Sequence, residues 1–222
     1  MWIFWFLLML ASVFHLAVIV LKKETLTRIS KCFLVPFLIA AYLSGGGTHF
    51  IPPVFALVLG WIGDILLIRI ERKPNFMLGL ASFLLGHLCY IFTFLLILGF
   101  FVAGTGKIDI SAIALFTPPA IILGFVVFRL VKPAKEMYIP VIVYMAILEI
   151  VTLFGFQVFL FNPGFAGLLI VSGCLCFMIS DTILAYYTFR KPKVSGSVLI
   201  MIYYILAQAE IIMGLLLLLK AA

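Results

Sequence analysis

Ionisable side chains inside long apolar stretches are the residues of this sequence best placed to do chemistry. They are Asp64, His87, Glu149, Asp181 and Glu210. A charged group in the hydrocarbon of a bilayer costs about 2.5–3.5 kcal/mol on insertion scales, so each one needs a partner, a water-filled cavity or a function. Two carboxyl groups that converge in a pocket shielded from water suit general acid/base catalysis, because one can keep its proton while the other stays ionised. Alternatively, Asp64 and Asp181 hold helices together or pair with Lys31 or an arginine.

The composition predicts that these residues lie in an integral membrane protein. Of the 222 residues, 66% are hydrophobic and 10% are charged, against about 45–50% and about 25% in soluble domains. A soluble fold of this size could not bury so much apolar surface. The net charge of +7 does not indicate nucleic-acid binding, because the basic residues form short clusters between apolar runs. We expect one all-α membrane domain, 1–222.

Charges, glycines and prolines divide the chain into about eight apolar segments, each near the ~20 residues that a spanning helix needs. The predicted segments are 2–21, 30–45, 51–69, 75–101, 109–130, 138–161, 164–189 and 195–219. The second is short. Pro36 and the pair Pro118-Pro119 fall inside segments and predict kinks.

The basic residues predict the orientation of this bundle. Of the 15 lysines and arginines, all but Lys107 and Lys220 lie at the first, third, fifth and seventh connections. Because cytoplasmic loops carry the excess of basic residues, both termini are expected on the non-cytoplasmic side. The short connections leave no room for a soluble domain and favour a bacterial inner membrane, with the endoplasmic reticulum of a eukaryote as the alternative. Any function then lies within the membrane or at its surface.

Both aspartates are expected in the cytoplasmic half of the membrane, near the basic face. Asp64 precedes Arg69 by five residues and Asp181 precedes Arg190 by nine, which places them ~7 Å and ~13 Å from the cytoplasmic ends of their helices. The sequence around Asp64, Gly-Asp-Ile-Leu-Leu, is similar to Ser-Asp-Thr-Ile-Leu around Asp181, four helices later. This similarity suggests a parallel repeat of two four-helix halves, and sites often lie between such repeats.

A set of polar and small residues, in order along five segments, resembles the YhhN-like lysoplasmalogenase family of membrane enzymes. The resemblance covers roughly residues 25–215. The matching residues are Lys31 and Pro36; Gly63, Asp64 and Leu67; Gly79, Phe83, His87 and Tyr90; Gly173, Phe177, Ser180, Asp181 and Leu184; and Tyr204, Ala207 and Gln208.

The resemblance implies hydrolysis of the vinyl ether bond of lysoplasmalogens, which releases a fatty aldehyde and a glycerophosphoethanolamine or -choline. Such a bond is cleaved by protonation on carbon and attack of water on the resulting oxocarbenium ion, so an acid and a carboxylate are required. Asp64 and Asp181 are the expected catalytic pair. Either one could donate the proton while the other stabilises the cation. The residues expected to orient them or bind substrate are Lys31, which would meet the phosphate, and His87, Tyr90, Ser180, Tyr204 and Gln208.

No metal or other cofactor is expected, since no cluster of residues has the spacing of metal ligands. Glu149 and Glu210 depart from the family's apolar pattern. The sequence assigns them no role; they could pair with His87, or with each other while sharing a proton. The oligomeric state is left open.

Four other functions compete with this one. A lipid-binding or transport protein without hydrolytic activity would also use intramembrane acids and a repeat. An intramembrane aspartyl protease is disfavoured, because Trp61 stands where its Gly-x-Gly-Asp motif requires glycine and no Pro-Ala-Leu motif follows. A prenyl or headgroup transferase would need aspartate-rich metal motifs. A purely structural subunit would leave the ordered polar residues unexplained.

Overall fold

The computed structural model describes residues 1–69, 73–99, 106–190 and 196–221, and within them the chain is all-helical. The long helices are α1 (Trp2–Val20), α2 (Glu24–Ser44), α3 (Pro52–Leu66), α4 (Lys73–Ile97), α5 (Ile110–Val131), α6 (Tyr138–Phe161), α7 (Phe165–Arg190) and α8 (Ser197–Ala221). Short 3₁₀ helices are η1 (Gly47–His49), η2 (Leu67–Arg69) and η3 (Lys135–Met137). These eight long helices confirm the predicted fold class.

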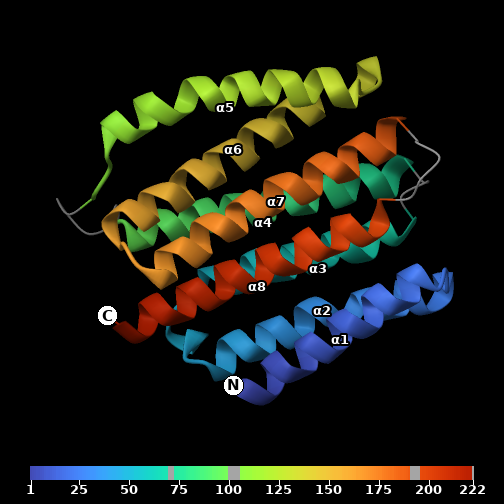
Figure 1. Ribbon diagram of the computed structural model, residues 1–222, viewed down its shortest axis with the longest axis horizontal. Helices are drawn as coiled ribbons and strands as arrows, with labels where there is room; N and C mark the ends of the chain where they lie inside the picture. Colours follow the sequence, from blue (N-terminus) through green and yellow to red (C-terminus); the bar gives the residue numbers. More distant parts are fainter. Residues whose placement is uncertain (70–72, 100–105, 191–195, 222) are drawn as a thin grey trace.

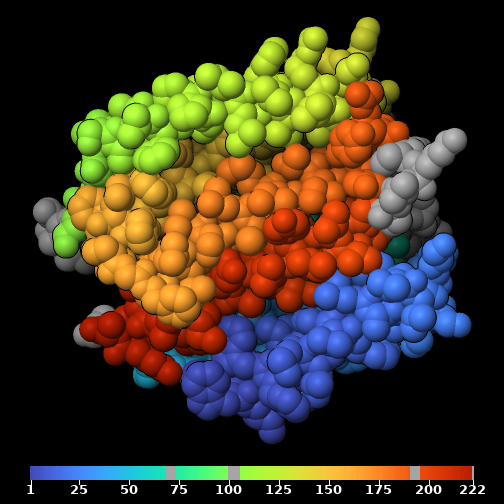
Figure 2. Space-filling view, in the orientation of Figure 1, coloured from blue at the N-terminus to red at the C-terminus, as the bar shows by residue number. Residues whose placement is uncertain are grey.

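The helices form a bundle of two layers with an extension on one side. One layer consists of α1, α8 and α7, with α8 packed between the other two. The other layer consists of α2, α3 and α4, with α3 packed between the other two (Figure 1). Helix α6 packs against both α4 and α7, and so closes one side of the two layers. Helix α5 packs on α6 and α7 and forms the outer edge, as Figure 2 also shows. The central helices therefore carry most of the buried core.

The outer surface of this bundle is apolar and much of its polar content is inside. Large hydrophobic side chains such as Ile110, Phe125 and Ile139 are exposed, whereas Asp64, His87 and Gln208 are buried. Within the described ranges, seven helices are long and apolar enough to cross a membrane. Helix α3 has 15 residues and is continued by η2. The protein is an integral, multi-pass membrane protein.

Both chain termini lie at one end of the bundle, opposite the turn between α1 and α2 and the connection between α5 and α6 (Figure 1). Basic residues such as Lys22, Lys23 and Lys132 lie at the far end from the termini, which agrees with the predicted alternation. Arg72, Lys191 and Lys193 lie outside the described residues, as do residues 101 and 195 at the ends of two predicted segments. The membrane side of the termini and the relation of the two halves as a repeat stay predictions.

The predicted start of the second segment at residue 30 is wrong, and α2 is not short. The helix begins at Glu24 and has 21 residues. Lys22 adopts a left-handed backbone conformation, with φ of 55°, so the chain reverses immediately after α1. The polar residues that follow continue the helix at the membrane surface, where Glu24 and Arg28 form an i,i+4 ion pair of 3.7 Å. Pro36 lies inside α2, and Pro118 and Pro119 lie inside α5.

Glycines allow close approach where the central helices meet. A Cβ atom added at Gly173 of α7 would lie 2.7 Å from Cγ1 of Ile211 and 2.9 Å from the backbone oxygen of Ala207, both on α8. A Cβ added at Gly63 of α3 would lie 2.7 Å from the ring of Phe83 on α4. Small residues at such crossings are a general device for packing helices within membranes. They hold α3 and α7, which carry the two aspartates, against their neighbours.

The variant Gly173→Ala should be less stable than the wild type. The added methyl group meets backbone of α8, which cannot move aside alone, so the free energy of unfolding should fall by about 1–3 kcal/mol. Thermal unfolding in mild detergent would measure this, with Ala146→Val on the exposed face of α6 as the control. Equal melting temperatures for wild type and Gly173→Ala would contradict the tight crossing of α7 and α8.

Candidate functional site

A polar cavity of ≈ 320 Å³ lies between the two layers at the basic end of the bundle. It is lined from six helices, because α1, α2, α3, α4, α7 and α8 all contribute side chains. The polar and charged residues of the lining are His15, Thr27, Arg28, Lys31, Asp64, Ser180, Asp181, Ser197 and Tyr204. Both aspartates singled out in the sequence therefore face one space.

Asp64 of α3 has partners that stabilise its ionised form. Its carboxylate is only 2% exposed. Nζ of Lys31 on α2 lies 3.0 Å from Oδ1, and the hydroxyl of Tyr204 on α8 donates to Oδ2 at 2.6 Å. Charge-assisted hydrogen bonds of this kind are stronger than neutral ones. The Asp64 carboxyl group is thus held by side chains of two other helices.

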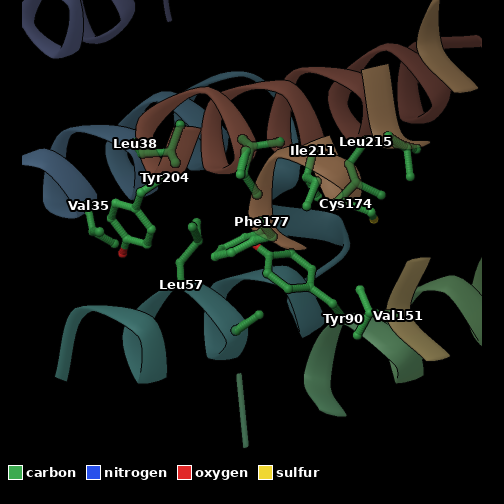
Figure 3. Packing of buried hydrophobic residues seen from close by; sticks show 14 of the residues in the cluster. Val35, Leu38, Leu57, Tyr90, Val151, Cys174, Phe177, Tyr204, Ile211 and Leu215 are labelled. Atoms are coloured by element: carbon green, nitrogen blue, oxygen red, sulfur yellow. The ribbon is translucent and has the colours of Figure 1, made fainter. Parts of the chain in front are cut away.

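A chain of hydrogen-bond donors runs toward Asp64 from the interior. The hydroxyl of Tyr90 on α4 donates to Oε1 of Gln208 at 2.7 Å, and the Gln208 side chain in turn hydrogen-bonds the Tyr204 hydroxyl. Phe177 of α7 lies between the rings of Tyr90 and Tyr204 (Figure 3), with centroids 6.4 and 5.8 Å away. Because each group donates a hydrogen bond to the next, this series of bonds fixes the direction of the hydrogen bond that Tyr204 donates to Asp64.

Asp181 of α7 has different surroundings. The hydroxyl of Tyr144 on α6 donates to its Oδ2 at 2.5 Å. Among the described residues, no lysine or arginine pairs with it, although Asp64 and Lys31 lie near enough for their charges to act on it. Its Oδ1 has no hydrogen-bond partner within the described part of the chain and is free to act in the cavity. Asp181 is thus the carboxyl group better suited to hold a proton.

Ser180, beside Asp181, joins two helices at the cavity wall. Its hydroxyl donates to the backbone oxygen of Ile200 on α8 at 3.0 Å. This bond fixes the part of α7 that carries Asp181 against the start of α8.

His87 is placed beside the site and does not reach the carboxylates. Its Nδ1 donates to the backbone oxygen of Phe83 at 2.7 Å, and its ring packs edge-on against Tyr144 and Phe177, with centroids 5.7 and 4.9 Å away. It is 2% exposed and does not line the cavity. Its contact with the site is through the ring of Tyr144, which it helps to position.

Glu149 and Glu210 do not pair with each other or with His87 in the described structure. The hydroxyl of Ser172 donates to Glu210 at 2.8 Å, and Cys176 lies 3.9 Å away, so Glu210 links α7 and α8. Glu149 of α6 lies against Gly124 of α5, where an added Cβ would be 2.5 Å from its Oε1. Neither pairing weighed from the sequence is therefore present among the described residues.

An apolar cleft meets the polar cavity at Asp181. It lies between α4, α5, α6 and α7, and its other lining residues include Leu80, Val127, Val131, Leu148, Ala185 and Phe189. Leu67, Phe83 and Leu184 line both spaces. A molecule with a polar head and a long apolar chain could therefore place the junction of the two at Asp181.

Two residues of the site, Tyr144 and His15, were missed by the sequence analysis. Tyr144 shares one face of α6 with the buried residues Val141, Leu148 and Val151, so helical periodicity alone makes it a core residue. The feature of the sequence that could have indicated a polar role for Tyr144 was its hydroxyl group. His15 is five residues from the end of α1, and Asp64 is five residues from Arg69. This equal depth was the feature that could have indicated His15 as a residue of the site.

One comparison with known proteins gave a match that covers most of the chain. The sequence profile of the YhhN family matches residues 26–215. The chain belongs to the YhhN family. The match includes both aspartates and the Lys31, Tyr204 and Gln208 side chains that support Asp64, whereas α1 precedes it. Comparison with curated proteins and with solved structures gave no significant match.

In this YhhN protein, Lys31→Met should destabilise the fold because it leaves a buried carboxylate unpaired, at a cost of about 3–5 kcal/mol. Adding Asp64→Asn should recover much of that loss, since the neutral amide needs no cation. Unfolding in detergent of the two single variants and the double variant would measure the coupling. Arg28→Met is the matched control, because its 3.7 Å pair with Glu24 is exposed and worth under about 1 kcal/mol. Additive effects of Lys31→Met and Asp64→Asn would contradict the ion pair.

Proposed function

We propose that the protein is a lysoplasmalogenase that hydrolyses the vinyl ether bond of lysoplasmenylethanolamine or lysoplasmenylcholine. One observation carries the proposal. Two carboxyl groups face a single cavity in unlike surroundings, and Asp181 stands where that cavity meets an apolar cleft. A pair of acids whose environments differ in this way is the usual arrangement for acid/base catalysis. Membership of the YhhN family supports a membrane enzyme of this kind.

In the first step, Asp181 donates its proton to carbon. Oδ2 of Asp181 accepts the bond from Tyr144, which leaves Oδ1 to carry the proton. The proton is transferred to the vinyl carbon farther from the ether oxygen. The carbon bonded to that oxygen then becomes an oxocarbenium ion, and Asp181 becomes a carboxylate.

In the second step, Asp64 stabilises the cation and water completes the reaction. The Asp64 carboxylate is held in place by Lys31 and Tyr204, so it does not have to reorganise when positive charge develops. Water adds to the cationic carbon and its released proton returns to Asp181. The hemiacetal formed collapses to a fatty aldehyde and the glycerophospho alcohol. The net change is the addition of one water across the bond, with the enzyme regenerated.

The substrate would lie with its two ends in the two spaces. Arg28 at the cavity mouth, whose side chain is 53% exposed, is a cation available to the phosphate. Lys31, expected from the sequence to meet the phosphate, is bound to Asp64 and would act on a phosphate only while keeping that contact. The alkenyl chain would enter the apolar cleft, whose outer wall is α5, a helix supported by α6 and α7.

We place the protein in the bacterial inner membrane with the basic end of the bundle, and therefore the site, toward the cytoplasm. Cytoplasmic loops carry the excess of lysine and arginine in such proteins. The phosphorylated headgroup would then lie at the cytoplasmic surface, next to the basic residues of the cavity mouth. No nucleic acid enters this proposal.

Purified protein in mild detergent should release fatty aldehyde from a lysoplasmalogen and none from an ester lysophospholipid. Asp64→Asn and Asp181→Asn should each lower the rate by about 10²–10⁴-fold, the usual contribution of a general acid or base. Glu210→Gln, on the same pair of helices, is the control and should stay active. In heavy water, rapidly trapped aldehyde should carry deuterium on the carbon next to its carbonyl group, since the acid protonates that carbon.

The lipid-binding or transport alternative gives a different result. Folded wild type that binds the lysolipid but releases no aldehyde would reject the hydrolase and leave the two aspartates as a binding pair. Aldehyde without deuterium on that carbon would reject the protonation step.

Filling the apolar cleft should impair long-chain substrates. Ala185→Phe places a ring in the cleft next to Asp181, so KM for a long alkenyl chain should rise by about tenfold or more, while a very short chain is affected less. Steady-state kinetics with substrates of two chain lengths would test this, with Ala146→Phe on the exposed face of α6 as the control. Equal effects of Ala185→Phe on both substrates would contradict the cleft as the chain site.

A further inference from the structure

His15 of α1 is a polar side chain in the candidate site that the proposed reaction does not use. Its ring is fully buried, at 0% exposure, and lines the polar cavity. Nδ1 is hydrogen-bonded to the Ser30 hydroxyl at 2.7 Å. Within the described residues Nε2 has no partner. Buried polar atoms are normally satisfied, so this nitrogen, on a residue that lines the cavity, is a candidate to bind a polar group of a ligand.

The position of His15 limits which part of a substrate it can meet. It lies five residues before the end of α1, as Asp64 lies five residues before Arg69 at the end of η2, so both are ~7 Å inside the bundle. Arg28, at the exposed mouth, is farther out. A group that contacts His15 is therefore close to the bond being cleaved, not at the phosphate. In a lysoplasmalogen, the free hydroxyl on the middle carbon of the glycerol is on the carbon next to the one that bears the ether oxygen.

The chemistry of the imidazole also favours a hydroxyl. Ser30 can give its proton either to Nδ1 of His15 or to the backbone oxygen of Thr27, 3.2 Å away. In the first case Nε2 carries a hydrogen and donates, and in the second it accepts. A hydroxyl group can satisfy either form, because it both donates and accepts. A phosphate oxygen would satisfy only the donating form.

We propose that His15 recognises the free glycerol hydroxyl of the lysolipid and so selects single-chain substrates against their acylated forms. This inference rests on the proposed function, because it names a specificity-determining contact of the same site. An acyl group on that oxygen removes the hydroxyl proton and adds bulk beside a buried nitrogen. Sites built to bind a hydroxyl reject analogues that lack it, because the polar group of the site is left unpaired.

The test compares substrates with and without the hydroxyl in wild type and His15→Leu. The probes are a lysoplasmalogen and its deoxy analogue, in which hydrogen replaces the hydroxyl. Wild type should have a kcat/KM about tenfold to a hundredfold higher for the hydroxylated substrate. His15→Leu should treat the two substrates alike. Ser30 keeps its bond to Thr27 in this variant, which favours normal folding.

Two further variants separate recognition from folding. His15→Gln places an amide nitrogen near the position of Nε2 and should restore part of the discrimination. Phe14→Leu changes the neighbouring residue, which is 50% exposed on the outer surface, and should discriminate as wild type does. The inference is overturned if wild type does not distinguish the substrates, or if His15→Leu distinguishes them as well as wild type does.

A binding measurement keeps this inference separate from the hydrolase proposal. Saturated alkyl ether lysolipids, with and without the hydroxyl, cannot be cleaved by protonation of a vinyl group. Calorimetry in detergent should show weaker binding of the deoxy lipid by wild type and equal binding of both by His15→Leu. That result without aldehyde release would reject hydrolysis and retain His15 as the hydroxyl-binding residue. Aldehyde release with no hydroxyl preference in either assay would retain hydrolysis and reject the role of His15.

Discussion

The ion pair between Lys31 and Asp64 is the interaction on which the site depends. It joins α2 to α3, and Tyr204 brings α8 to the same carboxylate. A carboxylate with 2% exposure cannot stay ionised in a membrane protein without such partners. The tyrosine and glutamine behind it fix the geometry of the last donor. Side chains of three helices thus meet at one carboxylate in the wall of the polar cavity.

The pair also creates the difference between the two aspartates. Lys31 is committed to Asp64, so Asp181 receives a hydroxyl from Tyr144 but no cation in the described structure. In the proposed reaction, two acids with such different neighbours take unlike roles. His87 supports this difference indirectly, because its ring packs on Tyr144, the residue that binds Asp181. The proposed reaction therefore takes the roles that the sequence left open from the neighbours of each carboxyl group.

The sequence predicted the helices well because membrane insertion imposes a strong pattern of length and charge. Asp64, Asp181 and Lys31 could be singled out because charged groups are costly among apolar residues. The start of α2 was misjudged, since polar residues at the membrane surface can continue a helix without an apolar signal. The role of Tyr144 could not be predicted, because its ring has the periodicity of a core residue and its partner is 37 positions away. The partners of Glu149 and Glu210 depend on how α5 and α8 pack, which local sequence does not encode.

The meeting of a polar cavity and an apolar cleft at Asp181 affects how the products of the proposed reaction would leave. Cleavage there yields one water-soluble molecule and one molecule that prefers hydrocarbon. The glycerophospho alcohol would depart through the mouth near Arg28 into water, and the aldehyde would pass along the cleft beside α5 into the bilayer. Because each product enters a different phase, neither needs to cross the space occupied by the other. Escape of the aldehyde into lipid also removes it from the water near the headgroup product, which opposes recombination of the two.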